Sequence, residues 1–466
     1  MKTVNALLLL IFSILSLNAC AQHTITGSFS SLVGQQVRLV GFDGFGIYTI
    51  DSTKVSEQGV FTLSYADKNQ GMGYLSAEDN KAYFVVLANE NIHIKGEVLS
   101  VAESVVTLSG KENKLFVQYA TEHPKREQAL SAWVYLQKIY GGDSLFAIQK
   151  SPQQAIETEM QRIKQEDLDF LNHLDTNTYI SWYLPIRKLV SSVSTVAQYR
   201  TEEIPATINA FRKINYTDKR LYKSGLYKDV IDSHFWLLEN MGQSLDTVFK
   251  EMNISINCMV ENLPKNEKKF NEITKYVFEL LERRSLFQAS EYLSIKILTQ
   301  NSCTVNDDLS KQLELYRAMK IGNIAPDIIF SGDVVKNGSI IETPKYLSDI
   351  QADYKVIFFG ASRCPKCAEE LSQLLPLYEK WKSKGVEVVF ISLDIDKTLF
   401  KDFSSIFPFV SMCDYKKWSA QAVKDYYVFA TPTIFLINKN QKIILRPNSV
   451  KQIDAWVDYS IGEIKQ

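Results

Sequence analysis

The stretch Tyr354–Glu370 reads YKVIFFGASRCPKCAEE and decides the fold of the C-terminal part of the chain. Its apolar run Val356–Phe359, rich in β-branched and aromatic residues, predicts a buried strand. After a Gly-Ala-Ser break, the motif Cys-Pro-Lys-Cys at 364–367 opens a predicted helix that continues over Ala368–Lys384. A strand that leads into a dithiol at a helix start indicates redox chemistry, because the helix dipole and the unpaired first-turn amides favour a thiolate.

The two cysteines have different predicted roles. Cationic Arg363 and Lys366 flank Cys364 and add to the helix effect, so a lowered pKa is expected for the Cys364 thiol. Cys367 lies a turn further in and is expected to be better buried, where it can attack a mixed disulfide on Cys364. The motif therefore predicts a catalytic pair that forms a redox-active disulfide.

A structural zinc site and an inert structural pair are the alternatives for these cysteines. Zinc needs about four ligands, usually from two such pairs or from one pair with histidines. The sequence has no second Cys-x-x-Cys, and none of its five histidines lies near the motif. An inert pair leaves the order of strand, Cys-x-x-Cys and helix unexplained. Redox chemistry without a metal or other cofactor is therefore favoured.

Two flanking segments carry a resemblance to a known family. Residues 322–327, GNIAPD, look like the Gly-x-x-Ala-Pro-Asp segment that TlpA/ResA-like thioredoxins share with peroxiredoxins. Residues 430–433, ATPT, precede a predicted strand at Ile434–Ile437 and look like the thioredoxin cis-proline loop. The portion Ile321–Gln466 therefore resembles the TlpA/ResA-like thioredoxins, the envelope branch of the thioredoxin superfamily.

The resemblance implies an exported thiol–disulfide oxidoreductase. In the family, the loop at Thr431 and Pro432 faces the Cys pair and offers backbone groups to an extended substrate. Glu370, six positions after Cys364, matches an internal carboxylate that many members use in proton transfer; an ordinary solvated acid at a helix start is the alternative. The residue before the first Cys is usually Trp in the family and is Arg363 here, a difference that bears on redox potential and partner preference.

Two other functions compete with disulfide exchange. A peroxidase would need Pro-x-x-x-Thr/Ser-x-x-Cys, which neither Cys364 nor Cys367 completes. An envelope binding or scaffold protein would use the N-terminal domains, but the retained Cys pair argues against an inert thioredoxin fold. The resemblance favours a reductant or isomerase over an oxidant. Spacing alone does not set this direction, since potentials of such motifs span about −270 to −120 mV.

The composition is that of an ordinary globular protein. The chain has 466 residues, for which two to four domains are expected, with 45% apolar residues and a net charge of −1. No basic surface suited to nucleic acid and no low-complexity tract is present. No nucleic-acid partner is therefore expected. The family resemblance implies disulfide-containing envelope proteins and an upstream electron donor as partners, both unidentified.

Residues 1–21 form a predicted signal peptide. Lys2 supplies a positive start, and Ala6–Leu17 is an apolar core too short to span a bilayer as a mature helix. Leu-Asn-Ala-Cys at 17–20 resembles a lipobox, after which Cys20 would carry lipid; Ala-Cys-Ala at 19–21 equally fits ordinary signal peptidase, with Gln22 as the first residue. Both alternatives predict export to the periplasm or cell envelope, either soluble or anchored by lipid.

Three domains are predicted to follow. Residues 22–110 alternate apolar and polar residues between turn signals, which predicts an all-β, sandwich-like domain. Residues 111–320 have helical periodicity, which predicts an all-α domain. Residues 321–466 follow a βαβα order that predicts an α/β thioredoxin-like domain, with a central mixed sheet flanked by helices. The first two resemble modules of unknown function found ahead of such thioredoxin domains, the β-domain in exported Bacteroidetes proteins.

Three further cysteines have open assignments. Cys258 and Cys303 lie in the predicted helical domain and form either a structural disulfide or two free buried thiols. Cys413 follows a short predicted strand, where a buried structural cysteine is favoured over a third redox thiol.

Overall fold

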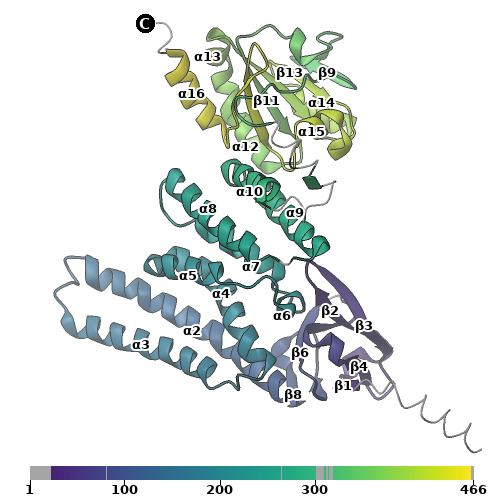
Figure 1. The fold of residues 1–466 in the computed structure, drawn as a ribbon, viewed down its shortest axis with the longest axis vertical. Coiled ribbons are helices and arrows are strands. Elements are labelled where there is room, and N and C mark those ends of the chain that lie inside the picture. Colours follow the sequence, from purple (N-terminus) through teal and green to yellow (C-terminus); the bar gives the residue numbers. More distant parts are fainter. Residues whose placement is uncertain are drawn as a thin grey trace, which may run out of the picture. The chain divides into compact units, whose positions relative to one another are not determined.

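A computed structural model describes residues 22–79, 81–263, 265–300, 309–310, 313 and 319–462. The predicted signal peptide with Cys20, and also Cys303, lie outside the described residues. The chain divides into two compact units, Met1–Asn262 and Leu263–Gln466 (Figure 1). The division falls inside the segment 111–320, so the helices after residue 263 belong to the unit that contains the Cys pair.

The first unit begins with two four-stranded sheets. Their orders are β4-β1-β7-β8 and β3-β2-β5-β6, which leaves β6 at an edge. Apolar residues from both sheets, among them Leu39, Val85 and Ile94, form one core, as a sandwich requires. The strands are β1 (Gln22–Ser28), β2 (Gln36–Asp43), β3 (Gly46–Lys54), β4 (Val60–Ala66), β5 (Gly71–Ser76), β6 (Ala82–Leu87), β7 (Ile92–Gly96) and β8 (Val105–Ser109).

Seven α-helices of the first unit follow the sandwich within the described residues. Helices α2 and α3 pack against each other, and their shared core contains Leu130, Val134, Ile156 and Ile163. None of the helices in the described part of the chain is both long and apolar enough to cross a membrane. The helices are α2 (Lys111–Gly142), α3 (Lys150–Asn172), α4 (Tyr179–Tyr199), α5 (Ile204–Arg212), α6 (Lys219–Tyr222), α7 (Tyr227–Glu239) and α8 (Leu245–Glu261).

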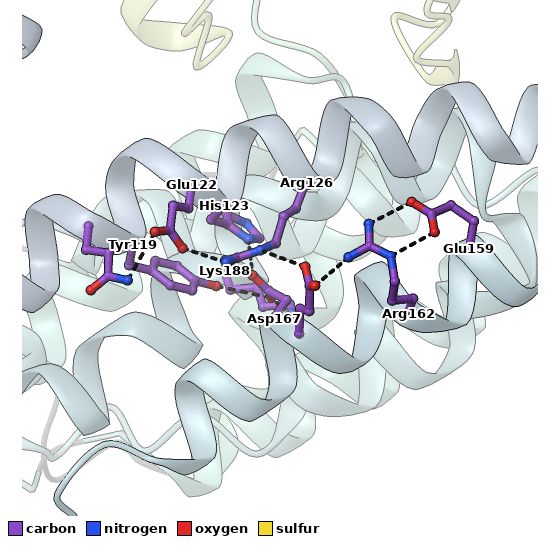
Figure 2. A network of polar contacts seen from close by, with 10 residues as sticks. Tyr119, Glu122, His123, Arg126, Glu159, Arg162, Asp167 and Lys188 are labelled. Carbon is purple, nitrogen blue, oxygen red and sulfur yellow. Dashed lines mark hydrogen bonds and ion pairs between the residues drawn. The ribbon is translucent and has the colours of Figure 1, made fainter.

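A buried cluster of charges joins α2, α3 and α4 (Figure 2). The Asp167 carboxylate lies 2.8 Å from His123 Nδ1 and accepts a hydrogen bond from Lys188 Nζ at 2.5 Å. Burial by itself raises the pKa of the Asp167 carboxyl, but these two partners outweigh burial and lower the pKa to about 2. Arg126 adds a further cationic group 3.8 Å away. The charge of Asp167 is thus compensated by its own neighbours, which is the condition for burying a carboxylate.

The second unit contains a helical pair, α9 (Glu267–Arg283) and α10 (Phe287–Gln300), and a seven-stranded mixed sheet. The sheet order is β10-β9-β13-β12-β11-β14-β15, in which β11, β12 and β13 are parallel and β14 runs antiparallel to β11. This is the predicted thioredoxin-like arrangement. The strands are β9 (Asp333–Lys336), β10 (Ser339–Ile340), β11 (Tyr354–Gly360), β12 (Val386–Ser392), β13 (Val410–Cys413), β14 (Thr433–Asn438) and β15 (Ile443–Leu445).

Helices cover both faces of this sheet. Phe358 belongs to the core on one face, which includes Trp381 and Val457, and Phe359 belongs to the core on the other face, which includes Tyr426. A strand buried on both sides needs apolar residues at every position, which explains the continuous apolar run. The helices are α12 (Pro365–Leu374), α13 (Tyr378–Ser383), α14 (Lys397–Ser404), α15 (Gln421–Asp425) and α16 (Val450–Gly462).

The prediction of one helix over Ala368–Lys384 is wrong. A 3-10 turn at Leu375–Leu377 separates α12 from α13. Pro376 lies in this turn, and proline has no N–H to donate to a carbonyl one turn earlier, so the α-helical ladder is interrupted there.

Candidate active site

The two predicted redox cysteines form a disulfide at the start of α12. Their Cα atoms are 5.2 Å apart. Cys364 is the N-cap of the helix and Pro365 is its first residue, a position where the missing N–H of proline has no cost. Cys367 is fully buried, whereas Cys364 is half-buried. Solvent and substrates therefore reach Cys364 before Cys367, which fits the predicted division of roles.

The Cys364 sulfur lies against the first turn of α12. The backbone N–H of Cys367 donates to Cys364 Sγ at 3.2 Å. After reduction the same amide and the helix dipole favour a thiolate at this sulfur. Lys366, which the sequence predicts to assist, is engaged elsewhere: its Nζ lies 3.0 Å from Glu370 and 3.1 Å from Glu369, and these carboxylates raise the pKa of Lys366. The helix start therefore acts directly on Cys364, whereas the charge of Lys366 is compensated by its two carboxylate neighbours.

The proline loop reaches the same sulfur. The peptide bond between Thr431 and Pro432 is cis, as the family resemblance implies. The carbonyl oxygen of Thr431 lies 3.5 Å from Cys364 Sγ. Two segments 67 residues apart in sequence thus meet at Cys364, and the backbone of Thr431 lies beside it.

Glu370 is buried on α12 and has two partners. It is 2% exposed, so the solvated helix-start acid considered from the sequence is excluded. Its Oε2 accepts the backbone N–H of Val450, the first residue of α16, at 2.8 Å, and its Oε1 pairs with Lys366. Two roles remain for this carboxylate: accepting the proton of Cys367, and binding the N-terminus of α16, where the helix dipole favours negative charge.

Asp394 supports the loop before the Cys pair, a role that sequence reasoning missed. Its buried carboxylate accepts the Ser362 backbone N–H at 3.1 and 3.2 Å, the Ser362 hydroxyl at 2.8 Å and the Ser392 hydroxyl at 2.8 Å. Strands β11 and β12 are parallel neighbours, so the residues after them share one edge of the sheet. An acidic residue just after the second strand of a βαβ pattern is the signal that could have found it.

Cys413 is a fully buried thiol at the end of β13. Its Sγ donates to the carbonyl oxygen of Asp394 at 3.3 Å. Burial raises the pKa of the Cys413 thiol to about 11, so the thiol stays protonated and unreactive at neutral pH. These observations support the structural assignment of Cys413. Cys258 in α8 is also free, and its candidate partner Cys303 lies outside the described residues.

Known proteins match this part of the chain. The AhpC/TSA family matches residues 321–446. The thiol-disulfide oxidoreductase ResA of Bacillus thuringiensis subsp. konkukian (strain 97-27) is 32% identical over 131 residues, which cover 27% of this chain and 68% of the relative. The chain belongs to the TlpA/ResA-like thioredoxin family.

Two other known proteins are similar to parts of this TlpA/ResA-like chain. ResA of Bacillus subtilis (strain 168) is 29% identical over 127 residues, 26% of this chain and 64% of the relative. The crystal structure of a thioredoxin-like protein from Bacteroides caccae ATCC 43185 has 17% identity and a TM-score of 0.37, covering 57% of this chain and 94% of that one. Membership of the ResA family makes the chain a thiol:disulfide oxidoreductase. Residues 321–446 contain all the candidate site residues named above except Cys20.

Proposed function

We propose that this chain is an exported thiol–disulfide oxidoreductase that exchanges disulfides with envelope proteins through Cys364 and Cys367. The observation that carries the proposal is the disulfide at the start of α12, whose half-buried sulfur lies 3.5 Å from the Thr431 carbonyl. A reactive sulfur next to the backbone of a half-buried loop is suited to a substrate that is itself a polypeptide.

The proposed reaction begins with the reduced enzyme. The Cys364 thiolate attacks one sulfur of a substrate disulfide, so that a mixed disulfide forms and the second substrate sulfur leaves and takes up a proton. Cys367 then loses its proton and attacks Cys364 Sγ, which releases the reduced substrate and leaves the Cys364–Cys367 disulfide. The substrate gains two electrons, and an upstream dithiol donor must return the enzyme to its reduced state.

Four supporting residues have proposed roles in this cycle. Glu370, one turn after Cys367 on the same helix, is proposed to accept the proton that Cys367 loses. Thr431 and Pro432 are proposed to dock the extended substrate segment beside Cys364. Asp394 accepts hydrogen bonds from Ser362 and so restricts the loop before the Cys pair. This restriction is proposed to keep Cys364 in place for its attack on the substrate.

Export and the direction of exchange are part of the proposal. The predicted signal peptide at residues 1–21 supports a periplasmic or envelope location, with either a lipid on Cys20 or Gln22 as the first residue. Reduction or isomerisation is proposed, in line with the family resemblance. Fractionation of cells and mass spectrometry of the mature N-terminus test the location. Cytoplasmic protein that retains Met1 would contradict export.

Trapping of mixed disulfides tests the exchange itself. The Cys367→Ser variant keeps the nucleophile but cannot resolve the intermediate, so envelope proteins should accumulate on Cys364 and be released by dithiothreitol. The matched control is Cys364→Ser, which has no nucleophile. Equal capture by both variants, or no capture by Cys367→Ser in the native envelope, would contradict the proposal.

A further inference from the structure

A groove of about 460 Å³ lies in the first unit, alongside the edge strand β6. One wall is β6 itself, with Phe84 45% exposed. A second wall is one face of α2, which includes Val117 and Ala120, and a third is the segment at Ala102 and Glu103 after β7. The groove involves no cysteine and plays no part in the function proposed above.

The groove side of β6 has vacant backbone groups. Strand β6 pairs only with β5, where Phe84 lies opposite Tyr74. At Val86 both backbone groups face away from β5: the Asn113 side chain accepts the Val86 N–H at 2.8 Å and donates to the Val86 C=O at 2.8 Å. Bonding directions alternate along an antiparallel strand, so the N–H and C=O of Phe84 and Ala82 face the same way as those of Val86. In the described part of the chain nothing binds these groups.

The Asn113 side chain therefore takes the place of one residue of a further strand that would pair with β6. Its amide gives and takes the same two hydrogen bonds that a strand residue opposite Val86 would make. The next positions along the edge, Phe84 and Ala82, are open in the groove. On the opposite wall, Pro124 has no N–H to donate to the Ala120 carbonyl within α2.

The charges in the groove favour a carboxylate. Lys125 and Arg187 both line it, and neither forms an ion pair within the described residues. The Arg187 guanidinium is held 5.0 Å over the Phe116 ring, which fixes its position. Glu103 is the one acidic side chain among the described lining residues, so the groove carries a net positive charge. An anionic group on a ligand would be attracted to this end of the site.

We propose that this groove binds an extended segment of another polypeptide, which adds to β6 as a further strand. Its backbone pairs with Phe84 and Ala82, its apolar side chains pack on Phe84 and on α2, and a carboxylate of the segment binds Lys125 and Arg187. Backbone pairing supplies affinity for any extended chain, and the apolar wall with the two cations supplies selectivity. The occupant is thus an apolar peptide segment with an acidic residue or a free C-terminus.

A peptide titration with the full-length protein tests the proposal. The probe is a fluorescein-labelled hexapeptide of alternating valine and threonine with a C-terminal aspartate, followed by fluorescence anisotropy. N-methylation of one alternate set of amides should weaken binding by about tenfold, since about two hydrogen bonds are lost, while methylation of the other set should change affinity less than about twofold. Equal effects of the two sets, or no saturable binding, would overturn strand addition.

Charge variants of α2 test the location. Lys125→Glu should weaken binding of the probe by about threefold to tenfold, as expected for reversal of a surface charge. Lys114→Glu, the same change at an exposed position of α2 outside the groove, should leave affinity unchanged and serves as the matched control. Equal losses in both variants would overturn the site. Sedimentation of the protein without peptide is the last measurement. If the protein is a dimer and Lys125→Glu dissociates it, the edge of β6 binds a second copy of the chain, and the proposal is also overturned.

Discussion

The start of α12 and the end of β13 lie in one domain, and each presents a cysteine in a different environment. Cys413 is fully buried, donates to the Asp394 carbonyl and has a pKa raised to about 11. Cys364 is half-buried, and its Sγ accepts a hydrogen bond from the Cys367 N–H at the start of a helix. Two differences thus distinguish a candidate redox cysteine from a packing cysteine. One is access to solvent, and the other is whether the nearby backbone group is an N–H that donates to the sulfur or a C=O that accepts from it.

Two buried carboxylates near these cysteines accept hydrogen bonds from backbone N–H groups. Glu370 accepts the Val450 N–H and ties α12 to α16, whereas Asp394 accepts the Ser362 N–H and ties the end of β12 to the loop before Cys364. Asp394 therefore contacts both regions, since its own carbonyl also accepts from Cys413. The comparison predicts that changes at the two sulfurs differ most, and that changes at the carboxylates have smaller effects.

The largest expected effect is the difference between two identical substitutions. Cys364→Ser should lower insulin-type disulfide reduction by at least about a hundredfold, because it removes the nucleophile. Cys413→Ser should stay within about twofold of the parent activity, because this thiol is buried and protonated. Full activity of Cys364→Ser, or a loss in Cys413→Ser as large as that in Cys364→Ser, would break the comparison.

The next effect concerns the support of the nucleophile. Asp394→Asn should cost about 1–3 kcal/mol of unfolding free energy and reduce activity by about tenfold, since a buried network is left partly unpaired and the Ser362 loop loosens. Asp396→Asn is the matched control: Asp396 caps α14 by accepting from Thr398 and Leu399, and asparagine caps a helix equally well. Chemical denaturation and steady-state rates measure both. A fully active Asp394→Asn would show that this carboxylate does not position the site.

The smallest effect is expected at Glu370. Glu370→Gln keeps the shape but removes a proton acceptor, so the resolving step should slow by about fivefold, the cost of about 1 kcal/mol, and its pH profile should move. Glu369→Gln, an exposed neighbour that also pairs with Lys366, is the control. A profile that does not move, together with a lower melting temperature, would leave Glu370 only the role of binding the N-terminus of α16.

The sequence was most informative where the signals are local. The apolar run of β11 and the helix start at Cys364 each occupy a few consecutive residues, so strand and helix could be predicted. The cis bond before Pro432 was implied by the family resemblance of its loop. Pro376 is an equally local signal, and it marks the break between α12 and α13.

Long-range contacts could not be predicted in the same way. Periodicity predicts that α9 is a helix but not which core it joins; it belongs to the second unit, where Glu282 forms a buried ion pair with Arg446, 164 residues away. The contact of Asp394 with Ser362 depends likewise on the pairing of β11 with β12. Such contacts follow from the topology, which single-residue patterns leave open.

The most direct test of the central claim is site-resolved alkylation of the reduced protein across pH. Iodoacetamide rates at each cysteine are followed by mass spectrometry. Cys364 should react fastest, with a midpoint clearly below the free-cysteine value of about 8.5. Cys413 should stay protected at neutral pH, because its pKa is raised to about 11 and thiolate forms only as the pH rises towards that value. A Cys364 midpoint at or above about 8.5, or faster labelling of Cys367, would contradict the account.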